Sequence, residues 1–369
     1  MIGSDAAGLT AGGRERVSAR AEMELTAGYH SPQLDVDVRL NTNESPVSPP
    51  SGLSERVAEA MATLAWNRYP DRSATALRSG LARLHGVGPE QVFAANGSNE
   101  VIQSLLLAYG GPERCAAVFE PTYALHSHIA RVTGTTVVEG RRHEDLSLDL
   151  AEVERVLTGS RPTVTFLCSP NNPTGIVDPP ATVAAVLEMV TDIGGLLCVD
   201  EAYGQFADHT AQSLLAPGVP LLVSRTYSKT WAMAAARLGY AIAPEWMVRN
   251  LEKVALPYHL DAVTQLAGTI ALDYVEEMSA RVSELVAERE RMTVALAELD
   301  VEVWPSGANF VLIRPRSLPG ERVWQLLVDR SILVRDCSSW PRLDGCLRVT
   351  VGTADEDDRF LAALTEVLR

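Results

Sequence analysis

The sequence predicts an α/β protein with a mostly parallel sheet covered by helices, followed by a smaller α+β unit. Between about residues 101 and 243, short apolar runs alternate with amphipathic helical segments. Runs that are apolar on both faces suit a parallel sheet that is buried on both sides. Beyond residue 299, short strands surround one helical segment, which is typical of a separate α+β unit.

The elements follow in chain order. Residues 1–28 are small, polar and unpatterned, and we expect a mobile arm there. The Pro- and Ser-rich stretch 45–52 predicts a loop. The predicted helices lie at 53–64, 74–84, 101–109, 181–189 and, as one long solvated helix, 281–299. The predicted strands of the main sheet lie at 116–119, 135–138, 164–168, 196–199, 221–224 and 239–243. Strands at 309–314, 333–335 and 347–351, with a helix at 324–329, make up the smaller unit.

Composition excludes some classes of protein. The chain has 369 residues, and its hydrophobic fraction of 46% excludes general disorder. Its net charge of −15 disfavours nucleic acid and anionic membranes as partners. A small anionic ligand stays possible, because it responds to local charge. Five cysteines without a CxxC pair, with Cys168 and Cys198 in apolar runs, indicate buried thiols and a reducing compartment. No apolar stretch has the length of a signal peptide or a membrane span, so we predict a cytoplasmic protein.

Two partial matches to familiar motifs lack features that those motifs require. Gly86 and Gly88 begin like a dinucleotide fingerprint, but no strand precedes them and position 91 is Gln. His126 and His128 could share one face of a strand, yet no third ligand lies nearby, so we predict no metal site.

Four polar segments follow predicted strands. They are NGSNE (96–100), SPNNPTG (169–175), DEAY (200–203) and TYSK (226–229), with RLGY (237–240) just beyond the last. Ligands of open α/β sheets bind outside the carboxyl ends of the strands. We therefore expect these segments to converge on one crevice.

The crevice would offer the groups that pyridoxal phosphate requires. Asp200 follows an apolar strand and suits a buried cation, and Lys229 can be desolvated as a Schiff-base lysine should be. Backbone N–H groups at 97–99 open a helix and form a natural phosphate site, to which Ser228 and Arg237 add donors. The protein must capture the cofactor's aldehyde, protonate its ring nitrogen and grip its phosphate.

SPNNPTG, VDEAYGQF, SRTYSK and RLGYAIA together resemble the signature of fold-type-I, class I/II aminotransferases, over a region from about Tyr29 to the C-terminus. Other segments are most similar to histidinol-phosphate aminotransferases, particularly those of actinobacteria. These segments are NTNESP (41–46), RYPD (68–71), AANGSNE (94–100), EPTY (120–123), ANFVLIR (308–314), ILVRD (332–336) and GCLRVTVGT (345–353).

The resemblance implies a cofactor, pyridoxal 5'-phosphate, and a role for each matching residue. Lys229 would bind the cofactor as a Schiff base and move the Cα proton, while Asp200 would pair with the ring nitrogen. Tyr203 and Asn172 would hydrogen-bond the phenolic oxygen, and Tyr123 would stack on the ring. The other cofactor-binding residues would be Gly97, Ser98, Asn99, Thr226, Ser228, Arg237 and, from the partner subunit of a homodimer with shared active sites, Tyr69.

The resemblance also implies small anionic substrates. Arg348 would clamp a substrate carboxylate, and Arg335, Tyr29 and Asn309 would add substrate contacts. The implied reaction is ping-pong transamination between glutamate/2-oxoglutarate and histidinol phosphate/imidazole-acetol phosphate, in histidine biosynthesis. A phenylalanine-type aminotransferase is the alternative, and a phosphothreonine-type decarboxylase of the same fold is a weaker one.

The family's architecture would place a seven-stranded sheet in a large cofactor-binding domain, at 53–275. The N-terminal segment 29–52 would join the small C-terminal domain, at 276–369. The stretch 230–236, Thr-Trp-Ala-Met-Ala-Ala-Ala, departs from the family pattern just after the lysine, and NESP (43–46) replaces the commoner NENP. Trp231 and the alanines are expected to line or support the cofactor site.

Overall fold

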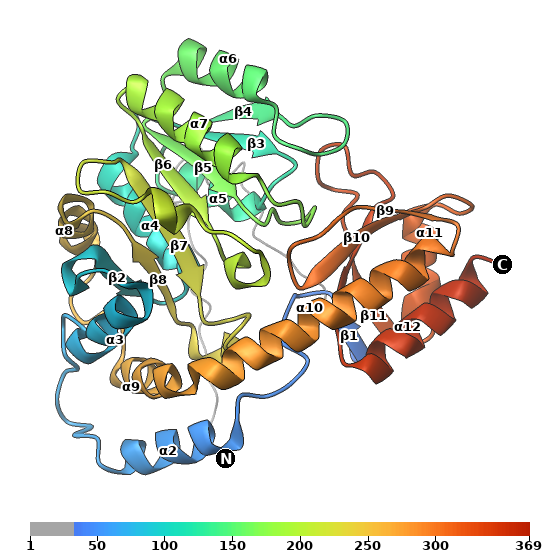
Figure 1. Ribbon diagram of the computed structural model, residues 1–369, viewed down its shortest axis with the longest axis horizontal. Helices are drawn as coiled ribbons and strands as arrows, with labels where there is room; N and C mark the ends of the chain where they lie inside the picture. The colour runs from blue at the N-terminus through green and yellow to red at the C-terminus, as the bar shows by residue number, and fades with distance from the viewer. Residues whose placement is uncertain (1–32) are drawn as a thin grey trace, which may run out of the picture.

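Two sheets organise the protein, for which a computed structural model describes residues 33–369 (Figure 1). The arm predicted at 1–28 and Tyr29 lie outside the described residues. The large sheet has seven strands in the order β2-β8-β7-β6-β5-β3-β4. Its strands are β2 (Val92–Ala95), β3 (Cys115–Glu120), β4 (Thr136–Arg141), β5 (Val164–Cys168), β6 (Leu196–Asp200), β7 (Leu221–Thr226) and β8 (Gly239–Ile242). Only β8 runs against its neighbours, so the prediction of a mostly parallel sheet is confirmed.

Helices cover both faces of the large sheet. On one face, side chains of β3, β5 and β6 pack against α4 (Ser98–Tyr109), α5 (Ala124–Val132) and α8 (Glu245–Val254). On the other face the alternate side chains of the same strands pack against α6 (Leu150–Ser160) and α7 (Pro180–Asp192). At the β2–β8 edge, α3 (Thr75–His85) and α9 (Ala262–Ala271) complete the cover, and α2 (Ser51–Ala62) packs outside them. Burial of both faces is the physical reason why the strand sequences are apolar throughout.

The small sheet has five strands in the order β1-β11-β12-β10-β9. They are β1 (Val38–Leu40), β9 (Val301–Val303), β10 (Phe310–Pro315), β11 (Ile332–Asp336) and β12 (Leu347–Thr350). The N-terminal β1 pairs in parallel with β11, so residues from opposite ends of the chain share one sheet. Its core is closed by α10 (Val275–Ala297), α11 (Gly320–Val328) and α12 (Ala354–Val367).

The long helix α10 connects the two sheets, as Figure 1 shows. Met278, near its start, packs with the β2–β8 edge of the large sheet, whereas Leu285 and Met292 pack into the core of the small sheet. The helix predicted at 281–299 is therefore the second part of a longer one. The proposed boundary between 275 and 276 falls at its first turn and stays a prediction.

One local prediction is wrong. His126 and His128 lie on α5 and not on a strand, so positions two apart point to different sides. Within residues 33–369, no cluster of three His, Cys, Asp or Glu side chains could hold a metal ion. In the same part of the chain, no helix combines the length and apolarity needed to cross a membrane.

Candidate active site

A cavity of about 360 Å³ lies at the carboxyl edge of the large sheet. The four polar segments singled out by the sequence all reach it, because β2, β5, β6 and β7 point the same way and end at the same edge. The predicted residues that line it are Ser98, Asn99, Tyr123, Asn172, Asp200, Tyr203, Thr226, Ser228, Lys229 and Arg237. Thr42, Glu44, Cys168, Ala202, Ala234 and Ala235 complete the lining.

Asp200 is the last residue of β6 and is 1% exposed. Its Oδ2 lies 3.1 Å from Nε2 of His126, which is fully buried and stacks on Phe166 at 4.7 Å. The other carboxylate oxygen accepts the backbone N–H of Ala202. A buried carboxylate held in this way on a cavity wall is suited to a cationic group in the cavity.

Lys229 follows β7 by three residues and is half-buried, with its amine in the cavity. Nζ donates to the backbone oxygen of Thr42 at 2.9 Å. Desolvation, with the positive charge of Arg348 acting in the same sense, lowers the pKa of Lys229 to about 7. The amine is therefore substantially neutral near pH 7 and available as a nucleophile.

The first turn of α4 and the loop after β7 form a small cradle. Gly97 precedes the helix with φ +79°, and a Cβ at this position would lie 2.7 Å from Nη2 of Arg237. The hydroxyl of Thr226 donates to Oγ of Ser228 at 3.0 Å, and Nη1 of Arg237 donates to the same oxygen at 3.4 Å. A Cβ at Gly239 would lie 2.3 Å from the backbone nitrogen of Ser98, so glycine lets β8 approach the helix start. Helix N–H groups beside a guanidinium and hydroxyls are a phosphate site in chemical terms.

Two tyrosines stand on the walls of the cavity. The hydroxyl of Tyr203 accepts from Nδ2 of Asn43 at 2.9 Å, and burial raises its pKa well above the usual range. The hydroxyl of Tyr123 donates to Oδ1 of Asn99 at 3.2 Å, and its ring meets His126 edge-on at 5.3 Å. Tyr203 thus stays protonated and can donate to an oxygen in the cavity.

The two arginines predicted to bind substrate lie on adjacent strands of the small sheet. Arg335 on β11 and Arg348 on β12 are directly opposite each other in the antiparallel register. Arg348 is buried and donates to Oδ1 of Asn172 at 2.5 Å and to the backbone oxygen of Asn41 at 2.8 Å. Its Nε has no hydrogen-bond partner in the described part of the protein. Both partners are neutral, so the buried guanidinium has capacity for an anion.

Six predicted residues are not among those that line the cavity. Gly97, Arg335 and Arg348 are three of them, and their surroundings are described above. Asn309 is buried and donates to the backbone oxygen of Asn43 at 3.2 Å. Tyr69 is 80% exposed and stacks on Tyr258 at 4.4 Å. Tyr29 lies outside the described residues.

The departure at 230–236 has two structural consequences. Ala234 and Ala235 line the cavity. Trp231 does not reach it but stacks at 4.9 Å on Tyr227, which is also buried and lies within the segment that carries Lys229. The expectation that this stretch lines or supports the site agrees with that placement.

The sequence did not identify His126 or the segment 41–44 as parts of the site. The bond from His126 to Asp200 was hidden because a helix, not a strand, orients that imidazole. Residues 41–44 reach the cavity because β1 pairs with β11, about 290 residues away in sequence. In the sequence, only the resemblance of NTNESP (41–46) to the family indicated that residues 41–44 matter.

The residues present fit pyridoxal phosphate. Gly97 leaves space that a Cβ would fill, Arg348 has an unpartnered Nε, and the Lys229 amine faces the same cavity as the buried Asp200. A neutral lysine for an aldehyde, a carboxylate for a pyridinium and a cradle for a phosphate define a pyridoxal-phosphate enzyme.

The family model for class I and II aminotransferases matches residues 36–364, so the chain belongs to the class I and II aminotransferases. It is 46% identical over 352 residues to a histidinol-phosphate aminotransferase of Frankia casuarinae, covering 92% of this chain and 87% of the relative. A second such enzyme, from Streptomyces avermitilis, is 44% identical over 365 residues, covering 96% and 98%.

Solved structures agree on the fold. Histidinol-phosphate aminotransferase of Sinorhizobium meliloti, in complex with pyridoxal-5'-phosphate, superposes with a TM-score of 0.85 at 21% identity, covering 96% of this chain and 98% of that one. L-threonine-O-3-phosphate decarboxylase of Porphyromonas gingivalis reaches 0.78 at 20% identity, covering 90% and 99%. The fold alone therefore does not distinguish transamination from decarboxylation. Pyridoxal phosphate is the cofactor of this aminotransferase.

Proposed function

We propose that this protein transfers the amino group between glutamate and imidazole-acetol phosphate, yielding 2-oxoglutarate and histidinol phosphate. The observation that carries the proposal is the pair Arg335 and Arg348, directly opposite each other on β11 and β12, with Arg348 hydrogen-bonded to the cavity residue Asn172. Two guanidinium groups match a phosphate ester, which carries more charge than the carboxylate of an aromatic amino acid. The relatives at 40–46% identity that bear the name histidinol-phosphate aminotransferase support the same assignment.

The protein's own residues have separate tasks in this reaction. Lys229 would hold the cofactor's aldehyde until the substrate amine replaces it, and its freed amine would then move the proton at the substrate Cα. Asp200, held by His126, would pair with the ring nitrogen of the cofactor. Bound pyridoxal phosphate supplies an electron sink for the electrons left at Cα. The cradle formed by Gly97, Ser98, Asn99, Thr226, Ser228 and Arg237 anchors the phosphate.

The remaining residues orient the reactants. Tyr203 and Asn172 would hydrogen-bond the phenolic oxygen of the cofactor, and Tyr123 would cover its ring. Arg348 serves the carboxylate of glutamate in one half of the ping-pong cycle and the phosphate of the second substrate in the other, where Arg335 assists. Asn309 supports the substrate site through Asn43, to which it is hydrogen-bonded. Tyr29 is proposed as a further substrate contact.

We also propose a homodimer that shares its active sites. Tyr69 is 80% exposed, and Trp66 and Tyr258, which line the same surface hollow, are 70% and 40% exposed. Large apolar side chains gathered in this way favour burial against a second copy. Tyr69 would then reach the cofactor phosphate of the partner. The cytoplasmic location, predicted because the sequence shows no signal peptide or membrane span and has the cysteines of a reducing compartment, belongs to the same proposal.

Half-reactions test the substrate. Histidinol phosphate, phenylalanine or phosphothreonine is added to the holoenzyme, and the absorbance of the cofactor is followed. Efficient conversion by histidinol phosphate and glutamate is expected. Conversion by phenylalanine alone would overturn the assignment in favour of the aromatic alternative, and carbon dioxide release from phosphothreonine would indicate the decarboxylase.

A further inference from the structure

The loop at 337–346, which joins β11 to β12, connects the two arginine-bearing strands to the large sheet. Its two ends are tied by the backbone bond from Cys337 N–H to the oxygen of Cys346, at 2.9 Å. Turn bonds within it run from Trp340 to Cys337 and from Leu343 to Trp340. A loop with this much internal bonding holds its side chains in one arrangement.

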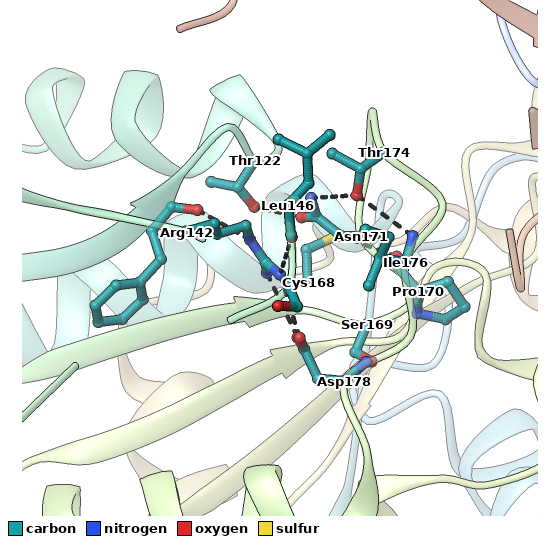
Figure 2. A network of polar contacts seen from close by, with 12 residues as sticks. Thr122, Arg142, Leu146, Cys168, Ser169, Pro170, Asn171, Thr174, Ile176 and Asp178 are labelled. Atoms are coloured by element: carbon teal, nitrogen blue, oxygen red, sulfur yellow. Dashed lines mark hydrogen bonds and ion pairs between the residues drawn. The ribbon is translucent and has the colours of Figure 1, made fainter. Parts of the chain in front are cut away.

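The apolar side chains of this loop pack on residues of both parts of the protein. Trp340 and Leu343 form a cluster with Trp304 and Leu312 from the small-sheet side and Leu146 from the large-sheet side. Ala124, in the first turn of α5, packs against the same cluster. Arg342 adds a hydrogen bond to the backbone oxygen of Arg142. Arg142 is itself held by the buried ion pair with Asp178 (Figure 2).

Trp340 makes two contacts that connect this loop to the site. Its indole N–H donates to the backbone oxygen of Thr122 at 3.0 Å, immediately before Tyr123. Its ring lies under the guanidinium of Arg335, with 5.2 Å between Cζ and the ring centroid. The turn that receives the N–H is itself anchored, because the hydroxyl of Thr122 donates to Oδ1 of Asn171 (Figure 2).

We propose that Trp340 is a positioning residue that determines specificity for a phosphate-ester substrate. Its ring holds the guanidinium of Arg335, and its N–H fixes that guanidinium relative to Tyr123 and the cofactor site. An aromatic face attracts a cation electrostatically, and this attraction restrains the direction of the guanidinium. The inference rests on the proposed function, because it assigns Arg335 to the phosphate of the substrate.

Variants of Trp340 test the role through a difference between two substrates. In Trp340→Leu the KM for histidinol phosphate is expected to rise about tenfold, while the KM for glutamate changes less than about twofold, because only the phosphate uses Arg335. Trp340→Phe keeps a weaker aromatic face, so a rise of about threefold is expected for histidinol phosphate alone. This second variant suffices if Trp340→Leu does not fold.

Trp324→Phe is the matched control. Trp324 belongs to α11, and its indole N–H also donates to a backbone oxygen, that of Val334, at 2.9 Å. Losing that bond should leave the ratio of the two KM values unchanged. In an Arg335→Met background, Trp340→Phe should add no further change in KM for histidinol phosphate, since the partner of the ring is absent.

Two results would overturn the inference and show that Trp340 has only a structural role. One is an equal change in the KM values for histidinol phosphate and glutamate in the Trp340 variants. The other is a further rise in the KM for histidinol phosphate when Trp340→Phe is added to Arg335→Met. Failure of the proposed function looks different. In that case the unmodified holoenzyme itself is not converted by histidinol phosphate.

Discussion

The amine of Lys229 is tuned by its neighbours. Desolvation and the charge of Arg348 lower its pKa to about 7, and only the neutral amine attacks an aldehyde. Uptake of pyridoxal phosphate by the cofactor-free protein should therefore accelerate as the pH rises through about 7. Stopped-flow absorbance measures the rate of uptake. Arg348→Met removes one of the lowering effects and should move the midpoint upward.

Arg314→Met controls for the loss of an arginine from the small sheet, because Arg314 on β10 lies over Trp304 and outside the cavity lining. The pH midpoint of cofactor uptake in Arg314→Met should match that of the unmodified protein. An unchanged pH midpoint in Arg348→Met as well would contradict the proposed electrostatic effect.

His126 is the residue through which α5 acts on the site. His126→Phe retains an aromatic ring to stack on Phe166 but loses the bond to Asp200. A hydrogen bond to a charged group contributes about 1.5–3 kcal/mol, so kcat should fall roughly 10- to 100-fold. Steady-state kinetics would measure this change. His128→Phe, on the same helix but away from Asp200, should retain activity, and equal losses in both variants would argue against a specific role.

At the scale of elements, a buried ion pair ties β6 to β7 behind the cavity. Glu201 follows Asp200 and Arg225 precedes Thr226, so side chains alternate and this pair lies on the opposite side from the site. The carboxylate of Glu201 accepts from Nη2 of Arg225 at 2.7 Å, and both side chains are buried. The pair thereby holds together the two strand ends that position Asp200 and Lys229.

Removing one member of that pair should be costly. Arg225→Leu leaves the buried carboxylate of Glu201 without its cation and is expected to lower the free energy of unfolding by about 3–5 kcal/mol. Arg249→Leu removes the exposed pair with Glu245 on α8 and should cost less than about 0.5 kcal/mol. Urea unfolding of both variants measures the difference, and similar small losses would refute the role of the buried pair.

At the scale of the whole molecule, the proposed shared sites make a quantitative prediction. Lys229→Ala lacks the amine and Tyr69→Phe lacks the phenol that would come from the partner, so each variant alone should be nearly inactive. Refolding an equal mixture should produce mixed dimers with one intact site, and about a quarter of normal activity should return. Absence of recovery, while each variant alone still forms dimers by light scattering, would exclude this arrangement.

The sequence by itself determined the fold class and most of the residues that line the site. Apolar runs report burial on both faces, and polar segments after parallel strands must meet at one edge, so Asp200, Lys229, Asn172 and the start of α4 could be placed together in advance. These inferences succeed because they depend only on local patterns and on the direction of the strands.

Only the tertiary structure decided how residues distant in sequence meet. The pairing of β1 with β11 brings residues 41–44 to Lys229, and the register of β11 with β12 sets Arg335 opposite Arg348. The turn of α5 aims His126 at Asp200, and the loop at 337–346 lays Trp340 between Arg335 and Thr122. Such contacts depend on long-range packing and side-chain direction, for which a single sequence has no periodic signal.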